Sequence, residues 1–238
     1  MPVMPPFDRN LPAGGATTQW AMIDGLAGGE AESAWRAFVD RYRPFVRALL
    51  LRSVRRSDWL KAAEDEFWGY VYLSDAIRRA DRGRRFRPYL TGIVHNFALA
   101  WLRRQPDTDP PTASGLEAPP VPGAPSQELG LWARNVLELA LATLARESPA
   151  MAAALRGFYG LGEGDAVAAP RSVTELATAL SASVANVYQL LSRGRRRLRT
   201  LVEEELLAGC AEATELDDER KLLIENLRTQ APGLFEGE

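Results

Sequence analysis

The chain of 238 residues contains one cysteine, one histidine and two lysines. A single cysteine, Cys210, excludes a disulfide within the chain, and a Cys/His metal site is not expected when His95 is the only histidine. We therefore expect neither a metal nor another cofactor. The low cysteine content is in keeping with a reducing cytoplasm, where we expect the protein to be located.

Long hydrophobic runs are missing too. No apolar run approaches the roughly 18 residues that span a bilayer, so membrane insertion is not expected. The first residues, MPVMPPFDRNLPAGG, have no basic stretch followed by an apolar one, and they are not typical of a signal peptide.

Enzyme motifs are equally scarce. The segment GLGEGD lacks the Lys-Ser/Thr pair of a phosphate-binding loop. Glu64, Asp65 and Glu66 have no histidine nearby, and helical spacing predicts that they are scattered over a solvated face. We therefore expect a protein that is not an enzyme.

Helical periodicity is the dominant pattern that is present. Apolar residues recur at three- and four-residue steps, whereas the alternation typical of a β-strand is nearly absent. The sequence therefore predicts an all-α fold. The predicted core residues of the first half are Trp35, Phe38, Val39, Tyr42, Val46, Leu49, Phe67, Tyr70, Val71, Ile77, Leu90, Ile93, Val94, Phe97 and Trp101.

The net charge of −2 hides an uneven distribution of charge. Residues 30–105 contain 16 basic and 9 acidic residues, and residues 128–201 contain 9 and 6. Residues 106–126 contain seven prolines, three acids and no basic residue, which predicts an extended linker. Residues 202–238 hold 11 acids against 3 basic residues. Two basic modules are thus joined to an acidic linker and an acidic tail.

These boundaries predict two helical domains joined by a Pro-rich linker. The expected segments are a flexible N-terminal tail (1–29), a first helical domain (30–105), the acidic linker (106–127), a second helical domain (128–206) and an acidic C-terminal extension (207–238). In the extension, residues 214–217 are a candidate cap for a short helix. Its expected apolar side consists of Leu222, Leu223, Ile224 and Leu227.

The second domain contains the pattern of a helix-turn-helix. Ser172 and Glu175 have the spacing of a capping box, which starts a short helix that runs to Leu180. The tight polar break SAS at 181–183 follows, and a longer helix begins at Val184.

Three single residues bear on this motif. Small Ala177 and β-branched Val187 are suited to the contact between the two helices. Ser181 stands where glycine is usual, and a left-handed backbone there costs a serine about 1 kcal/mol.

The longer helix has an apolar stripe and a polar face. The stripe consists of Val187, Leu190 or Leu191, Gly194, Leu198 and Leu201. The opposite face carries Ala185, Asn186, Tyr188, Gln189, Ser192, Arg193, Arg196 and Arg197. The first polar side chains suit base edges, and the arginines further along suit phosphates. The alternative is a solvated, basic helix end in a small bundle.

The first domain has a second basic and aromatic segment, RADRGRRFRPYLTGIVHNFALAWLRR at 79–104. Arginines beside aromatic rings can hold unstacked bases as well as phosphates. For Phe86 and Tyr89, however, we expect a place in the core.

Three parts of the chain together resemble an extracytoplasmic-function (group 4) sigma factor of bacterial RNA polymerase. They are AEDEFWGYVYLSDAI…FRPYLTGIVHNFALAWLRR, the acidic Pro-rich linker, and SVTELATALSASVANVYQLLSRGRRRLR. Their order is that of sigma region 2, linker and region 4. The resemblance covers roughly residues 30–206.

The resemblance implies a promoter-specificity subunit that binds the β′ clamp helices and the β flap of core RNA polymerase. Whether an anti-sigma factor is a further partner stays open. It implies that Ala185, Asn186, Tyr188, Gln189, Ser192, Arg193, Arg196 and Arg197 contact the −35 element of promoter DNA. For the −10 element it implies Asp81, Arg82, Arg84, Arg85, Arg87, Asn96, Trp101, Arg103 and Arg104. For polymerase binding it implies Glu64, Asp65 and Trp68.

The sequence also departs from the family. The family's Gln-Glu pair in region 2 is Trp68-Gly69 here, and residues 207–238 extend beyond the usual end. Two other functions therefore stay open: a sigma-derived DNA-binding regulator without initiation activity, and an adaptor that binds polymerase or another protein through aromatic surfaces. The extension is either a packing or solubilising tail or a regulator whose acids compete with DNA for the arginines.

Overall fold

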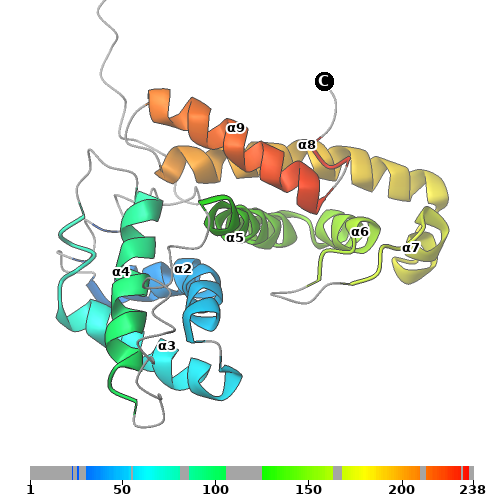
Figure 1. Cartoon of the computed structure of the whole chain (residues 1–238). Helices are drawn as coiled ribbons and strands as arrows, with labels where there is room; N and C mark the ends of the chain where they lie inside the picture. Colours follow the sequence, from blue (N-terminus) through cyan, green and yellow to red (C-terminus); the bar gives the residue numbers. More distant parts are fainter. Residues whose placement is uncertain are drawn as a thin grey trace, which may run out of the picture.

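The computed structural model describes residues 23, 26, 31–54, 56–80, 86–105, 125–162, 168–209, 213–231 and 233–235. Within these ranges the chain forms helices and no β-strand, which confirms the all-α prediction. The helices are α2 (Ala31–Val54), α3 (Ser57–Leu73), α4 (Phe86–Leu102), α5 (Pro125–Glu147), α6 (Pro149–Tyr159), α7 (Val173–Ala179), α8 (Val184–Gly209) and α9 (Ala213–Gln230) (Figure 1). None of these described helices is long and apolar enough to cross a membrane.

Several predicted features lie outside the described residues. They are most of the N-terminal tail, the basic loop at 81–85, linker residues 106–124 and Cys210. The predicted linker does need one correction, because α5 already begins at Pro125. Proline is tolerated in the first turn of a helix, where the backbone N–H has no helical partner. The linker prediction therefore ended three residues too late.

The first three helices pack around an aromatic core. Helix α2 contacts both α3 and α4. Phe38 on α2 meets Phe86 on α4 edge to face, with ring centroids 6.1 Å apart, and both side chains are fully buried. The prediction was wrong for Tyr70, which is 46% exposed near the end of α3. Its ring nevertheless covers Phe97, at a centroid distance of 5.6 Å.

Helix α5 connects this group to the remaining helices, since it contacts α2, α6, α8 and α9. Trp132 of α5 stacks on Tyr42 of α2 with an interplanar angle of 10° and meets Phe45 edge to face. A second link joins Arg41 of α2 to Glu205 of α8 by an ion pair, and both side chains are nearly buried. The buried side chains of all the helices consequently form one continuous core.

Helix α9 lies along α5 and α8 (Figure 1). It is longer than the short helix that the sequence predicted, with 18 residues. Leu223 and Leu227 are fully buried, Ile224 is partly buried, and Leu222 is 42% exposed, so the predicted apolar side is confirmed except at Leu222. Leu234 and Phe235 continue the contact beyond the helix. The described part of the extension thus packs on the core.

Candidate nucleic-acid interface

The helix-turn-helix begins with the predicted capping box. The backbone N–H of Glu175 donates to the Ser172 hydroxyl at 3.2 Å, and the Ser172 N–H donates to the Glu175 carboxylate at 2.7 Å. The hydrogen bond from the Ser172 backbone holds the pKa of Glu175 below its usual range. Two backbone donors without helical partners are thereby satisfied, and the start of α7 is fixed.

The turn between α7 and α8 has the left-handed residue that the sequence placed at Ser181, with φ of 50°. The N–H of Ser181 donates to the carbonyl of Thr178, and the N–H of Ala182 donates to that of Ala177 at 2.9 Å. This pair of hydrogen bonds is a Schellman motif. Ser183 then accepts from the N–H of Asn186 at 3.2 Å and caps α8. The turn is therefore closed on both sides by backbone and hydroxyl groups.

The buried stripe of α8 sets which side faces solvent. Val187, Leu191 and Leu198 are almost fully buried, whereas Leu190 is only partly buried. Gly194 lies against α6, where a Cβ would come within 3.3 Å of Leu155. These contacts confirm the predicted stripe and leave the opposite side of the helix uncovered.

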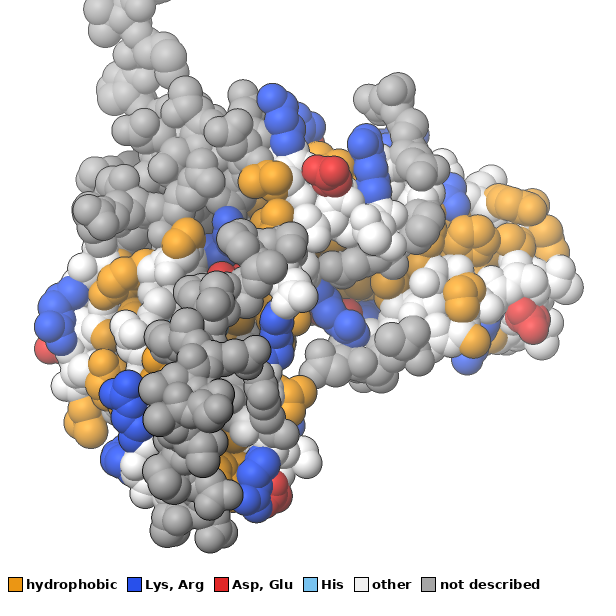
Figure 2. Space-filling view, viewed as in Figure 1, with side chains coloured by type: hydrophobic (Ala, Val, Ile, Leu, Met, Phe, Trp, Pro, Cys, Tyr) orange, Lys and Arg blue, Asp and Glu red, His pale blue; other side chains and the backbone are white. Residues whose placement is uncertain are grey.

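The uncovered side carries the side chains predicted to meet base edges. Ala185, Asn186, Gln189 and Ser192 are exposed, and Tyr188 is 60% exposed. These residues occupy the end of the molecule that carries α7 and the start of α8, away from α9 (Figure 1). Figure 2 shows basic side chains over α8 beyond its first turns and over α9. One helix thus presents amide and hydroxyl groups first and arginines further along.

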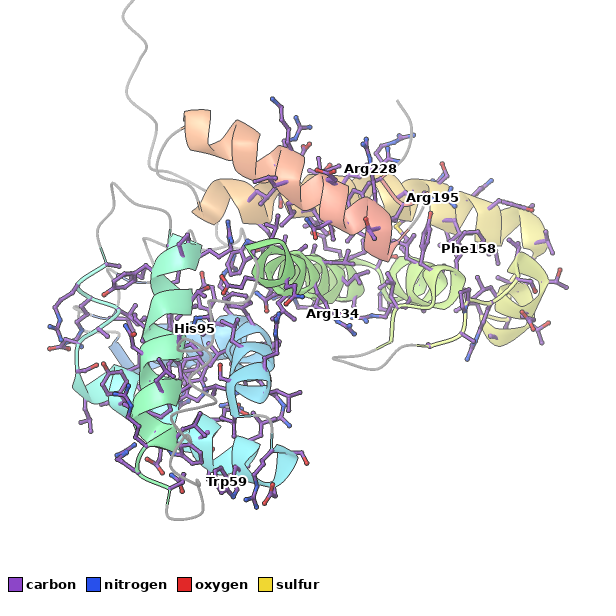
Figure 3. All side chains as sticks on the ribbon, in the orientation of Figure 1. Trp59, His95, Arg134, Phe158, Arg195 and Arg228 are labelled. Carbon is purple, nitrogen blue, oxygen red and sulfur yellow. The ribbon has the colours of Figure 1, made fainter. Side chains whose placement is uncertain are left out.

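The five arginines between 193 and 199 do not share one role. Arg193 and Arg196 are exposed and make no ion pair with another described residue. Arg195 turns inward, where its Nε donates to the Tyr159 hydroxyl at 2.8 Å beside the Phe158 ring (Figure 3). The Nε of Arg199 donates to a backbone carbonyl that follows α9.

Arg197 differs from the prediction that it faces solvent freely. Its Nε and Nη2 donate to both oxygens of Glu147 on α5 at 2.7 and 2.6 Å, and its Nη1 donates to Glu204 at 3.0 Å. The hydrogen bonds from Arg197 hold the pKa of Glu147 below its ordinary value of 4.5, and hydrogen bonding to Glu147 and then Glu204 raises the pKa of Arg197. Arg197 therefore fastens α8 to α5.

The structure distributes the predicted −10 residues unevenly. Asp81, Arg82, Arg84 and Arg85 lie outside the described residues. On α4 and just after it, Asn96 and Arg103 are exposed and Arg87 is half-buried. Arg104 is exposed but paired with Glu66 at 3.1 Å.

Trp101 requires a correction. It is 2% exposed, and its ring meets Trp59 edge to face at a centroid distance of 5.7 Å. The side chain belongs to the stripe that packs α4 against its neighbours, so it cannot lie against a DNA strand in this conformation.

Two of the three predicted polymerase-binding residues are buried as well. Glu64, which the sequence placed on a solvated face, is 7% exposed and accepts from Arg47 at 2.7 Å, with Arg43 at 3.5 Å. Trp68 is 8% exposed among aromatic rings. Asp65 is exposed and paired with Lys61. Of these three predicted residues, Asp65 is the exposed one.

Sequence reasoning missed the pair of Arg41 and Glu205. The two residues are 164 positions apart and belong to no local pattern, so only the packing of α8 near α2 brings them together. The inward turn of Arg195 was missed too, although the adjacent aromatics Phe158 and Tyr159 were a signal that one arginine of the run had a ring to cover.

No group of three or more His, Cys, Asp or Glu in the described part of the chain is placed to hold a metal ion. The arrangement offers hydrogen-bond donors, acceptors and positive charge, which are the means of binding nucleic acid. Comparisons with protein-family models, with curated proteins and with solved structures found no match to this chain.

Proposed function

We propose that this protein is a sigma factor of the extracytoplasmic-function type, which binds core RNA polymerase and directs it to promoters with −10 and −35 elements. The observation that carries the proposal is the capped α7–turn–α8 unit, whose second helix leaves Asn186, Tyr188 and Gln189 exposed with Arg193 and Arg196 beyond them. A helix that enters the major groove by its N-terminal turns reads bases there and meets phosphates further along.

At the −35 element the two kinds of side chain have separate roles. The Asn186 and Gln189 amides carry a donor and an acceptor each, which match the N6 and N7 edge of adenine. Arg193 and Arg196 neutralise phosphates and make the affinity dependent on salt. Arg197 has no such role in this proposal, because two glutamates already hold it.

For the −10 element the proposal retains the exposed residues of the α4 region. Asn96 and Arg103 lie on the solvent side of this region, and the basic loop before α4 supplies four charged residues in sequence. A base leaving the stack costs a few kcal/mol, which contacts from these groups must offset. Trp101 supports the α4 core instead of touching the strand.

The decisive experiment is run-off transcription on DNA that the protein itself selects. Duplexes bound by the intact chain are enriched from a random library and then used as templates with bacterial core RNA polymerase. We expect a transcript of defined length only when the chain and a selected template are both present. The double change Asn186→Ala and Gln189→Ala should lower this transcription at least tenfold, since each lost base contact costs about 1–3 kcal/mol.

Gln127→Ala is the matched control, because it removes an exposed amide of α5 that lies apart from the α7–α8 unit. It should leave transcription unchanged. Selected duplexes that bind but yield no transcript would contradict the sigma proposal.

That negative result would favour the second candidate, a DNA-binding regulator without initiation activity. Its supporting observation is that Glu64 and Trp68 are engaged within the first three helices. A failure to enrich any duplex would contradict both functions. It would favour an adaptor, for which the exposed Tyr70 and Tyr72, with the exposed Leu73 beside them at the end of α3, form the apolar, aromatic surface.

A further inference from the structure

A groove of about 330 Å³ lies between α8 and the segment formed by α9 and Phe235. Four arginines line it: Arg196 and Arg199 from α8, Arg220 and Arg228 from α9. Among the described residues that line the groove, Glu203 is the one acid, and it is already paired with Arg220 at 2.7 Å. The groove therefore has a large excess of positive charge.

Two of these arginines have guanidinium groups available for a ligand. Arg196 and Arg228 are exposed and make no ion pair with another described residue. They come from different helices, so a ligand held by both bridges α8 and α9. The side chain of Arg228 rises from α9 beside α8 (Figure 3). One guanidinium group can donate two parallel hydrogen bonds to the oxygens of a phosphate. Such charge-assisted hydrogen bonds are among the strongest in proteins.

The floor of the groove is apolar. Val202, Leu206 and Phe235 are each less than a tenth exposed, and Ile224 is partly buried beside them. A bare inorganic anion would satisfy the arginines and leave this floor in contact with water. A ligand with an apolar body and a charged end satisfies both parts, as is usual for small-molecule sites of this size.

We propose that the groove between α8 and α9 binds a small organic phosphate, a phosphomonoester on an aromatic or apolar body. A phosphomonoester carries close to two negative charges at neutral pH and three acceptor oxygens, which fits a groove lined by four arginines better than a single carboxylate does. The groove shares Arg196 with the proposed DNA contacts, whereas Arg228 has no part in them. A change at Arg228 therefore tests the groove independently of the proposed sigma function.

Calorimetric titration of the full chain in a low-salt buffer without phosphate tests the site. The probes are phenyl phosphate, inorganic phosphate and phenol. We expect phenyl phosphate to bind at one site, inorganic phosphate to bind about tenfold more weakly, and phenol not to bind. No binding of phenyl phosphate at millimolar concentration would overturn the proposal, as would equal affinities for phenyl phosphate and inorganic phosphate.

The variant Arg228→Glu separates this groove from other basic surfaces. It should weaken phenyl phosphate binding by about tenfold or more, since an attractive charge becomes a repulsive one. Lys61→Glu makes the same change of charge on the exposed side of α3 and should leave the affinity unchanged. Equal affinities of Arg228→Glu and the unaltered chain would overturn the proposal, and circular dichroism of both variants verifies that they are folded.

A final arm distinguishes a small ligand from the DNA backbone, which carries the same phosphate chemistry. Affinities for a duplex DNA should be the same for Arg228→Glu and Lys61→Glu. A larger loss in Arg228→Glu would mean that the groove serves duplex DNA, and the small-ligand proposal would be wrong. A failure of the sigma proposal, by contrast, would appear in the transcription experiment and leave these titrations unaffected.

Discussion

Helix α4 and the first half of α8 both combine aromatic residues with arginines, yet the structure uses them in opposite ways. Trp101 on α4 is 2% exposed, whereas Tyr188 on α8 is 60% exposed. Helix α4 packs against α2 and α3, and its ring-bearing side is taken up by those contacts. The first turns of α8 pack through Val187 and Leu191, with Leu190 partly buried beside them, so their other side stays open. An aromatic residue next to arginines is thus not by itself evidence of a nucleic-acid contact. Its position relative to the apolar stripe decides whether the ring is buried in the core or exposed to solvent.

The largest effect expected from this comparison is on stability. Trp101→Ala should lower the free energy of unfolding by about 3–5 kcal/mol, because it removes a large buried ring and leaves a cavity. Tyr188→Ala should change it by less than about 0.5 kcal/mol, since the ring is exposed. Chemical denaturation of both variants measures the difference. Similar losses in the two variants would break the contrast between the helices.

The next effect concerns the arginines of α8 and is measured on duplex DNA. Arg193→Ala with Arg196→Ala should reduce the slope of log affinity against log salt by about 2, because two phosphate contacts and their released counterions are lost. Arg197→Ala should leave the slope nearly unchanged, because Glu147 and Glu204 already neutralise this side chain. Gel shifts at several salt concentrations give the slopes. A slope reduced by about 1 in Arg197→Ala would show that Arg197 leaves its two glutamates and contacts a DNA phosphate.

The smallest effect is the pH dependence of the same ion pair. Hydrogen bonds from Arg197 lower the pKa of Glu147 in the folded chain, so the pair stabilises the fold above the ordinary carboxyl pKa of 4.5. This contribution is lost as the pH falls through the lowered pKa. It should amount to less than about 1 kcal/mol, because both side chains are more than a third exposed and water screens them.

Glu147→Gln should therefore lower stability slightly at pH 7 and flatten the loss of stability below pH 4.5, measured by denaturation at each pH. The matched control is Asp65→Asn, which removes an exposed carboxylate paired with Lys61 but not with α8. If stability falls equally steeply with decreasing pH in Glu147→Gln and in the unaltered chain, the Arg197–Glu147 pair does not contribute to the acid sensitivity of the fold.

Features that depend on neighbours in the chain could be predicted from the sequence. The capping box at Ser172, the left-handed Ser181 and the buried stripe through Val187 are set by spacings of a few residues, and each is present. The all-α class follows from the same short-range periodicity.

Features that depend on which helix lies opposite could not be predicted. Nothing near Arg197 shows that Glu147, 50 residues earlier, accepts its hydrogen bonds. Glu64 looks like part of an exposed acidic run until α2 brings Arg43 and Arg47 to it. One interpretation of the acidic extension was that its acids face the arginines. Among the described side chains, Arg220 of α9 pairs with Glu203 of α8, a contact that the composition of the extension could not indicate.

Helix α7 has only seven residues, which is too short for a helix to persist alone in water, where about 12–15 residues are marginal. Its order comes from its capped ends and from Leu176 and Ala177, which are buried against α6 and α8. The α7–turn–α8 unit therefore depends on its contacts with α6 for its order. We expect the hydrogen-bonded amide protons of α7 to exchange with solvent when the packing of α6, α7 and α8 opens, because α7 is held in place by its contacts with α6 and α8.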